Sequence, residues 1–494
     1  MRLKLASRKS DLARWQAVQV GRALETLPEN PSIEFIFKAS LGDQDLDTPL
    51  ANMGAKGVFT EDFHQDLLEG RCDLVVHSWK DLPVEPREQT EIAMTLPRAD
   101  VRDLLLVPEE VWQEAVKTGT LKILTSSPRR VYNLSACLAK LLPAKVKLEF
   151  VNVRGNVPTR LTKMRQQNSA LILAKAGLDR LLEAEASGFE IHMRALIENC
   201  RFMVLPISLN PAAAAQGALA IEILRTNEML KELCGRLSDL RSVESVNEER
   251  EILQSYGGGC HQKIGVTILQ REFGRVLSLR GITDQGEILH KWRVDDGVEW
   301  ARAKSADAVF PHDPKENSWF ERQELPCRDL AEVPALFVAR ADALPTSFKA
   351  SGKQILWTSG VASWQKLALR GLWVNGTFDG LGENEDPALE QLCGPVHWAK
   401  VTHKEGRPQF DLIATYELIP RKIHPDLRGK THFYWMSTSS FERARQLFPQ
   451  EIEHGYNACG PGSTWSHLMK QELKHRPKVF VGIEQFREES DPRS

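Results

Sequence analysis

The sequence lacks any apolar run long enough to cross a bilayer, and it lacks an excess of charge of one sign. A membrane-spanning helix needs about 20 consecutive apolar residues, and the 494 residues contain no such run. Residues 1–7 alternate apolar and polar side chains like a strand, instead of forming the apolar segment of a signal peptide. The formal net charge of −2 gives no overall attraction to nucleic acid or to a membrane surface. We therefore expect a cytoplasmic protein with neither kind of partner.

The chain also lacks paired cysteines. Its eight cysteines are scattered, without a CxxC pair and without histidines at the spacing of a metal site. We expect free thiols and no bound metal. The composition, 42% hydrophobic and 26% charged, is typical of an ordinary soluble protein. Because a single core rarely serves a chain of this length, we expect about three or four domains.

One cysteine occupies an unusual position. Cys260 follows three consecutive glycines, residues 257–259, between a predicted helix and a predicted strand. Glycine adopts backbone angles that other residues avoid, so the loop can hold the thiol outside the core. A turn with an incidental cysteine is the alternative, and the motif alone does not decide between the two.

The first hundred residues predict a β-α-β arrangement with a candidate site at a strand end. Residues 3–6 and 33–37 form strands, and Ser10 is a good N-cap for the helix between them. Beyond a polar, glycine-rich loop, a buried strand at 73–76 is followed closely by Lys80 and Asp81. Ligands of open α/β sheets bind at such strand ends, so both side chains are candidates for chemistry. A solvated loop is the alternative.

Three strand-to-helix turns farther along the chain carry arginines. Each follows a predicted strand, at residues 121–124, 147–153 or 169–174. Unpaired N–H groups and the helix dipole favour anions at a helix start, and guanidinium groups bind carboxylates through two N–H groups at once. An ordinary solvated face would not place arginine repeatedly at such turns. We predict a polyanionic ligand bound by Arg129, Arg130, Arg154, Arg160 and Arg180.

Eight motifs, taken in order, resemble porphobilinogen deaminase (hydroxymethylbilane synthase). They extend over roughly 300 residues and together are far more specific than any one of them. The resemblance implies an α/β fold of three domains, two of them similar to the halves of a periplasmic binding protein and the third a small cysteine-loop domain. It also implies a dipyrromethane cofactor held by a thioether to Cys260. The motifs are Arg8-Lys9-Ser10, Gly42-Asp43, Lys56-Gly57-Val58-Phe59, His77-Ser78-Trp79-Lys80-Asp81-Leu82-Pro83, Thr125-Ser126-Ser127-Pro128-Arg129-Arg130, Arg154-Gly155-Asn156-Val157-Pro158-Thr159-Arg160, Gln216-Gly217-Ala218-Leu219-Ala220-Ile221-Glu222 and Gly258-Gly259-Cys260.

The resemblance implies a role for each candidate residue. Asp81 would be catalytic, because a fixed carboxylate stabilises the azafulvene cation left by deamination and handles the pyrrole N–H and the leaving ammonia. Phe59 would lie over the pyrrole rings, with a plain hydrophobic anchor as the alternative. The groups around the cofactor on Cys260 would be Lys80, Asp81, Ser126, Arg129, Arg130, Arg154 and Gly155. The substrate porphobilinogen and the linear tetrapyrrole product would be bound by Arg8, Ser10, Lys56, Phe59, Arg154, Arg160 and Arg180.

Two positions depart from the family pattern. Asn52 stands where most members have a second lysine, and Lys263 stands where the cysteine loop usually continues into proline. Neither position makes or breaks a bond, so attachment through Cys260 is still expected. The detailed loop geometry and one carboxylate contact are left open.

The deaminase pattern ends before residue 310. Residues 266–269, 276–282 and 288–294 predict a small antiparallel sheet, and 309–332 is interpreted as a linker. The remaining residues, 333–494, contain strand-to-helix turns rich in serine, threonine and glycine, which bind carboxylates through backbone N–H groups. The candidate residues there are Ser359, Ser437, Thr438, Ser439, Gly462, Ser463 and Thr464.

This C-terminal region resembles a shortened uroporphyrinogen-III synthase. Such a domain would act mainly by positioning the linear tetrapyrrole so that its last ring is inverted on closure. An accessory or oligomerisation domain is the alternative. The tail would form one α/β domain or a pair of small lobes.

The expected domains follow from these motifs. Deaminase domain 1 comprises residues 1–97 and 202–222, domain 2 comprises 98–201, and the cofactor-attachment domain comprises 223–308. The predicted function is the polymerisation of four porphobilinogen molecules to hydroxymethylbilane in tetrapyrrole (heme) biosynthesis, with cyclisation to uroporphyrinogen III if the tail is a synthase. We expect a monomer. A solute-binding sensor module is the competing hypothesis for the front half, although it would have no use for Cys260 or Asp81.

Overall fold

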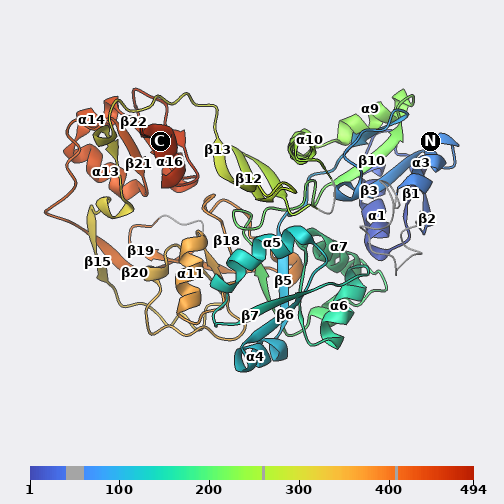
Figure 1. The fold of residues 1–494 in the computed structure, drawn as a ribbon, viewed down its shortest axis with the longest axis horizontal. Helices are drawn as coiled ribbons and strands as arrows, with labels where there is room; N and C mark the ends of the chain where they lie inside the picture. Colours follow the sequence, from blue (N-terminus) through green and yellow to red (C-terminus); the bar gives the residue numbers. More distant parts are fainter. Residues whose placement is uncertain (40–59, 259–261, 407–409, 494) are drawn as a thin grey trace. The chain divides into compact units, whose positions relative to one another are not determined.

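The computed structural model describes residues 1–39, 60–258, 262–406 and 410–493 (Figure 1). Three predicted site residues, Lys56, Phe59 and Cys260, lie outside the described residues, as does Asn52. The chain separates into two compact units. Unit 1 consists of residues 1–139, 145–268 and 278–290, and unit 2 consists of 140–144, 269–277 and 291–494. The predicted mixed α/β fold is confirmed.

The first sheet of unit 1 has the strand order β2-β1-β3-β10-β4. β1 is parallel to β2 and β3, whereas β10 runs antiparallel between β3 and β4. Helix α1 contacts this sheet because Ala17, Val20 and Leu24 recur on one face and are fully buried. The strands are β1 (Arg2–Arg8), β2 (Ser32–Lys38), β3 (Leu74–Ser78), β4 (Thr90–Met94) and β10 (Leu219–Leu224), and the helices are α1 (Asp11–Glu25), α3 (Glu61–Leu68) and α9 (Glu228–Leu237).

The second sheet of unit 1 repeats this arrangement in the order β7-β6-β8-β5-β9. β6 is parallel to β7 and β8, and β5 runs antiparallel between β8 and β9. The chain enters this sheet at β5 and returns to the first sheet as β10. The strands are β5 (Asp103–Pro108), β6 (Thr120–Leu124), β7 (Lys147–Val151), β8 (Ala170–Ala174) and β9 (Cys200–Val204), and the helices are α4 (Glu109–Thr118), α5 (Pro128–Cys137), α6 (Val157–Gln166), α7 (Lys175–Ala186) and α8 (Met193–Ile197).

A third, three-stranded sheet follows helix α10 (Leu240–Ser255) in the chain. Its strands are β11 (Gly265–Arg271), β12 (Gly274–Ile282) and β13 (Ile288–Asp295), in that order across the sheet. The three strands predicted for this region are therefore confirmed.

Unit 2 contains two further sheets. One has four parallel strands in the order β14-β21-β22-β23, and the other has the order β15-β20-β19-β16-β17-β18 with only β15 antiparallel to its neighbour. The strands are β14 (Val309–Phe310), β15 (Phe320–Glu324), β16 (Ala335–Val338), β17 (Ile355–Thr358), β18 (Gly376–Thr377), β19 (Trp398–His403), β20 (Asp411–Pro420), β21 (His432–Trp435), β22 (Tyr456–Cys459) and β23 (Lys478–Val479). The helices are α11 (Val361–Leu369), α12 (Glu390–Cys393), α13 (Thr438–Leu447), α14 (Pro449–His454), α15 (Ser463–Leu468) and α16 (Ile483–Ser490).

The stretch 309–332, expected to be a linker, contains two strands. β14 pairs with β21 and β15 pairs with β20, so the chain crosses here from one sheet of unit 2 to the other. The sequence suggests a linker because β15 is an edge strand. Its side chains are mostly exposed and charged, and it shows no buried apolar face.

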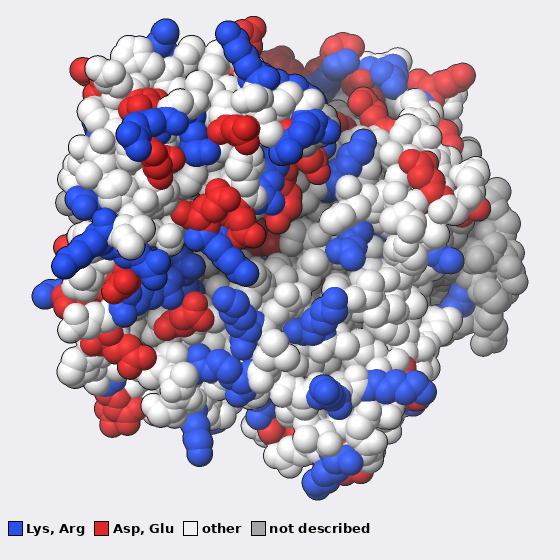
Figure 2. All heavy atoms as spheres, turned by 60° about the vertical axis from the view of Figure 1, so that its left-hand side comes forward, with Lys and Arg blue, Asp and Glu red and all other residues white. Residues whose placement is uncertain are grey.

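The described residues were searched for two kinds of feature. Among them, no helix is long and apolar enough to span a membrane, and no cluster of His, Cys, Asp and Glu is arranged to hold a metal ion. Acidic side chains lie among the basic ones over the face drawn in Figure 2.

Candidate functional site

Lys80 and Asp81 follow the carboxyl end of β3 in a short 3-10 helix, Trp79–Asp81. The backbone holds this helix in place, because the N–H of Trp79 donates to the carbonyl of Ala218 at 3.1 Å and the N–H of Leu82 donates to the carbonyl of Trp79 at 3.1 Å. The indole of Trp79 is buried in a small apolar cluster. Asp81 itself is exposed. A fixed backbone thus presents an accessible carboxylate at the strand end.

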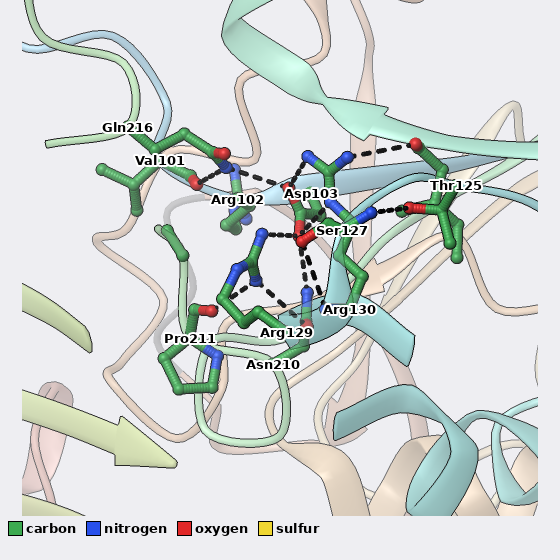
Figure 3. A network of polar contacts seen from close by, with 12 residues as sticks. Val101, Arg102, Asp103, Thr125, Ser127, Arg129, Arg130, Asn210, Pro211 and Gln216 are labelled. Carbon is green, nitrogen blue, oxygen red and sulfur yellow. Dashed lines mark hydrogen bonds and ion pairs between the residues drawn. The ribbon is translucent and has the colours of Figure 1, made fainter. Parts of the chain in front are cut away.

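Arg129 and Arg130 point from the first turn of α5 at the buried carboxylate of Asp103 on β5 (Figure 3). Arg129 Nη2 lies 2.8 Å from Asp103 Oδ2, and Arg130 Nη2 lies 2.7 Å from Asp103 Oδ1. Asp103 also accepts from the side-chain amides of Asn210, at 2.8 Å, and Gln216, at 2.9 Å. Asp103 is completely buried and both arginines are nearly so, and the two ion pairs therefore lie inside the protein.

The charges in this network do not balance. Burial acts to raise the pKa of Asp103, but the positive charges of Arg129 and Arg130 outweigh it and hold that pKa well below its usual range. One carboxylate therefore serves two guanidinium groups. Each guanidinium has five N–H donors, and Nε of Arg129 is buried without a hydrogen-bond partner. The network has one positive charge in excess.

Two further cations lie in the same electrostatic environment. Burial lowers the pKa of Lys80; the carboxylate of Asp81 opposes this change, and the positive charge of Arg130 adds to it. Burial and the charge of Arg130 likewise lower the pKa of Arg160, and Asp81 again opposes them. Around Asp81 and Asp103 there are thus four cations and two carboxylates. A ligand that carries several carboxylates would neutralise this excess.

The turn before α6 is built around a glycine. Gly155 has φ +112°, and a Cβ there would lie 2.6 Å from Thr159 Cγ2, so no other residue fits. Asn156 caps the helix by accepting from the N–H of Thr159 at 2.9 Å. Arg160 Nε donates to the carbonyl of Gly155 at 2.7 Å, and Lys163 Nζ donates to the carbonyl of Arg154 at 3.0 Å. The predicted arginine turn is therefore present as a helix N-terminus.

The remaining predicted residues of unit 1 lie on separate elements. Ser10 caps α1, where its hydroxyl accepts from the N–H of Ala13 at 3.4 Å. Arg8 is the last residue of β1. The hydroxyl of Ser126 donates to the carbonyl of Val153. Arg180 Nη2 donates to the carbonyl of Gly217 at 2.8 Å, and burial lowers the pKa of Arg180 to about 10 against the opposing charges of Glu183 and Asp179.

Sequence reasoning missed Asp103, Asn210 and Gln216 as parts of this site. Asp103 begins a strand in which every residue is buried. A buried acid must be paired, so an aspartate at the start of the apolar run Leu104–Val107 was the available signal. Asn210 and Gln216 lie in a loop ahead of β10 and gave no periodic signal.

In unit 2 the predicted hydroxyl and glycine turns lie at strand ends as expected. Ser359 follows β17 and donates to the carbonyl of Ala339 at 2.7 Å. Ser437 follows β21 and caps α13 by accepting from the N–H of Ser440 at 3.2 Å, with Thr438 and Ser439 in the first turn of the helix. Ser463 and Thr464 begin α15.

Glycine turns from the two sheets of unit 2 meet. A Cβ on Gly382, which follows β18, would lie 2.7 Å from the Cα of Gly462, which follows β22. Both glycines have positive φ, +101° and +98°. The carboxyl ends of strands from both sheets therefore come together at this point.

Comparison with known sequences covers the N-terminal part of the chain. Residues 3–232 match the family described as "Porphobilinogen deaminase, dipyromethane cofactor binding domain". The porphobilinogen deaminase of Moorella thermoacetica is 35% identical over 56% of this chain and 81% of its own length. Those of Campylobacter fetus (33%, covering 58% and 88%) and Clostridium beijerinckii (36%, covering 58% and 89%) are similar. The chain belongs to the porphobilinogen deaminase family.

Comparison with solved structures adds nothing to this assignment. The regulatory domain of OxyR from Pseudomonas aeruginosa is 10% identical, covers 48% of this chain and 96% of its own, and superposes with a TM-score of 0.25. The periplasmic sulfonate-binding protein SsuA from Methylobacillus flagellatus is 11% identical, covers 51% and 72%, and has a TM-score of 0.26. Likeness at this level carries no argument about the chain.

The cofactor of the matched family domain is a dipyrromethane, and the residues present fit such a group. Its pyrroles carry acetate and propionate side chains, so it brings several carboxylates into one place. Lys80, Arg129, Arg130 and Arg160 outnumber the carboxylates of Asp81 and Asp103. The unpartnered Nε of Arg129 is a further donor. The side chains that would contact the dipyrromethane are therefore mostly cationic, which fits its carboxylates.

Proposed function

We propose that unit 1 is a hydroxymethylbilane synthase that joins four porphobilinogen molecules head to tail and releases ammonia. Membership of the porphobilinogen deaminase family supports this activity for the N-terminal part of the chain. The observation that carries the proposal is the accessible carboxylate of Asp81 at the end of β3, in the electrostatic environment of the cations Lys80 and Arg160. Such an arrangement can hold an anionic substrate and stabilise one positive charge on it.

The reaction defines what these side chains have to do. In each cycle the C–N bond of the substrate's aminomethyl group breaks and ammonia leaves, and the same carbon bonds to the α-carbon of the preceding pyrrole, which loses a proton. In the final step the bond between the methylene carbon of the first unit and the pyrrole that carries the chain would break. The methylene carbon would take the hydroxyl group of water, which gives the hydroxymethyl end, and the α-carbon of the carrier pyrrole would take up a proton. Asp81 stabilises the positive charge that develops as ammonia leaves and accepts the pyrrole N–H. When bound, the dipyrromethane supplies the α-carbon that accepts the first substrate.

The basic residues bind and orient the growing pyrrole chain and the cofactor. Arg154, Arg160 and Lys80 bind carboxylates of the growing chain, with Arg8, Ser10 and Arg180 near its periphery. Arg129 and Arg130 would hold the carboxylates of the cofactor, with Ser126 and Gly155 in the adjoining turns. Lys56 and Phe59, which lie outside the described residues, contact the substrate. Cys260 holds the cofactor through a thioether.

Intact-mass spectrometry tests the attachment. Protein made in cells that produce porphobilinogen should be heavier than its sequence by one dipyrromethane, and Cys260→Ser should abolish the excess mass. Cys72→Ser is the matched control, since burial raises the pKa of Cys72 to about 12 and leaves no reactive thiolate. A wild-type mass equal to the bare sequence would remove the synthase proposal and favour a binding module.

For unit 2 we propose uroporphyrinogen-III synthase activity. The proposal is supported by the hydroxyl turns at Ser359 and Ser437 and by the meeting of Gly382 and Gly462, which brings strand ends of two α/β sheets together. Backbone N–H groups at such ends bind carboxylates, and inversion of the last pyrrole ring depends on holding the linear tetrapyrrole before it closes. An accessory domain is the alternative.

The isomer of the product distinguishes the two roles of unit 2. Hydroxymethylbilane closes unaided to the type I uroporphyrinogen, so full-length protein given porphobilinogen should yield type III only if unit 2 directs closure. The experiment needs the whole chain, because Phe273 and Val276 pack in one cluster with Val479 and a truncated chain would expose that cluster. Exclusive type I product, with no other synthase present, would leave unit 2 an accessory domain.

A further inference from the structure

A cavity of about 900 Å³ lies beside α5 in unit 1. Arg129 and Arg130 are buried on one face of this helix together with Asn133, Leu134 and Cys137. The cavity lies along the opposite face, where its lining includes Pro128, Val131, Tyr132, Ser135 and Ala136. Because these sets alternate with the helical period, the cavity is separate from the arginine–Asp103 network. The two share only the turn that precedes the helix, residues 125–127.

The lining of this cavity combines an apolar body with basic groups. Most of its exposed lining is apolar, with Phe150, Ile288 and Leu289 among the side chains that contribute. Ile288 is 73% exposed, which is unusual for so large an apolar side chain. The aromatic ring of Tyr132 adds a flat surface from α5. A ligand with a ring or other apolar body would cover these groups.

Lys263, Arg280 and His290 supply the basic groups of the same lining. The side chains of these three residues form no hydrogen bond or ion pair within the described part of the chain, and no Asp or Glu is among the lining residues. Lys and Arg are cationic at neutral pH. Arg280 is half-buried, so a carboxylate paired with it is screened less than on an open surface, whereas Lys263 and His290 are exposed.

We infer that this cavity is a second ligand site, which takes an aromatic carboxylate. The apolar lining recognises the ring, and Arg280 and Lys263 bind the carboxylate. The volume lies within the range of cavities that hold small organic ligands, about 300–1,000 Å³. The inference does not depend on the deaminase assignment, because Arg280, Lys263 and the apolar side chains named for it have no role in that mechanism. Ser126, in the shared turn, is common to both sites.

Fluorescence titration of the cofactor-loaded full-length protein with 1-pyrenebutanoate tests the inference. Binding should be saturable. The neutral analogue 1-pyrenebutanol should bind about tenfold more weakly or worse, since a hydrogen bond to a charged group contributes about 1.5–3 kcal/mol, or roughly 10–100-fold. Butanoate without the ring should not compete at the same concentration, because it lacks the apolar body.

Two variants locate the bound probe. Arg280→Glu should weaken 1-pyrenebutanoate binding at least tenfold through loss of the cation and repulsion, and Ser135→Trp should block the cavity, since Ser135 is exposed and tolerates a larger side chain. Lys291→Gln is the matched control, because Lys291 is an exposed neighbour of His290 outside the lining. Equal affinity in wild type and both variants, or no saturable binding to wild type, would overturn the inference.

Discussion

The two units bury different kinds of side chain. Among the described residues, the buried Asp, Glu, Lys and Arg of unit 1 are Asp66, Asp103, Arg129, Arg130, Lys175, Arg180, Glu222 and Glu249, whereas those of unit 2 are Asp379 and Lys478. The largest fully buried aromatic side chains are distributed the other way. Unit 1 has Trp15 and Phe63, and unit 2 has Phe310, Trp319, Trp357, Trp364, Phe433, Trp435, Phe441, Phe480 and Phe486.

This difference shows which groups each unit could offer to a polyanionic ligand. Buried charge is costly unless it is paired, and unit 1 carries that cost where Arg129 and Arg130 share one carboxylate. The cations of unit 1 are fixed in advance, so little reorganisation is needed when carboxylates arrive. Unit 2 obtains its stability from aromatic packing, and its candidate site offers backbone turns and hydroxyl groups instead of buried cations.

The largest effect is expected where buried charge is least balanced. Asp103→Asn leaves Arg129 and Arg130 without a counter-charge and should lower the free energy of unfolding by about 3–5 kcal/mol. Urea unfolding of purified protein measures the change. In the matched control Glu29→Gln, which breaks the exposed pair of Glu29 with Arg236, the unfolding midpoint should not move. A stable Asp103→Asn protein would show that the network does not depend on its central charge.

A somewhat smaller effect is expected for Asp81 at the end of β3, on the rate of turnover instead of on stability. Asp81→Ala should lower turnover by about 10²–10³, or ~2.7–4 kcal/mol of barrier, because the lost charge acts mainly in the transition state. The exposed position of Asp81 predicts an unchanged unfolding midpoint. Single-turnover assays of the cofactor-loaded protein separate this loss from defective loading. Near-normal turnover would remove Asp81 from the mechanism.

Low pH should destabilise unit 1 through protonation of Glu222. Burial acts to raise its pKa, but the hydrogen bonds from His77, at 2.9 Å, and Thr90, at 2.6 Å, together with Arg87, bring the pKa to about 2. Because the folded-state pKa lies below the ordinary value near 4.5, the stabilisation is present above pH 4.5 and is lost as the pH falls from 4.5 towards 2. It amounts to about 3 kcal/mol.

Hydrogen exchange resolved by peptide provides the measurement for this acid effect. Protection of the β10 peptide should fall between pH 4.5 and 2 in wild type, and the fall should be absent in Glu222→Gln. Peptides from β21 and β22 in unit 2 serve as the internal control, since neither strand contains an Asp or Glu residue. Equal acid sensitivity in both variants would show that other carboxylates control unit 1.

The smallest effect is expected in unit 2. Replacing Ser437, Thr438 and Ser439 together with alanine should shift the product from type III toward type I, while the rate of porphobilinogen consumption stays at the wild-type value. Chromatographic separation of the oxidised porphyrin isomers gives the ratio. Loss of the Ser437 cap alone costs about 1 kcal/mol of helix stability, so Ser437→Asp, which keeps a cap, separates helix stability from ligand binding. An unchanged isomer ratio would remove these hydroxyls from the proposed site.

The strand-to-helix turns and the family could be predicted from the sequence alone, because turn chemistry and motif order are local properties. Ser10, Ser127, Asn156 and Ser437 each cap the helix that follows them, and the strands predicted after Cys260 are present as β11, β12 and β13. The glycine turn expected at position 155 is present, and its positive φ explains why glycine stands there.

Only the tertiary structure decided which charges meet. Asp103, Arg129, Asn210 and Gln216 are separated by up to 113 residues along the chain, and their pairing requires β5 to run antiparallel beside β8 and the chain to return before β10. The stretch 309–332 was interpreted as a linker for a related reason, because an exposed edge strand such as β15 obtains its hydrogen bonds from β20 and leaves no buried periodicity in its own sequence. Ion pairs and strand pairs between residues far apart in the sequence depend on the stability of the complete fold. Local sequence patterns therefore do not predict them.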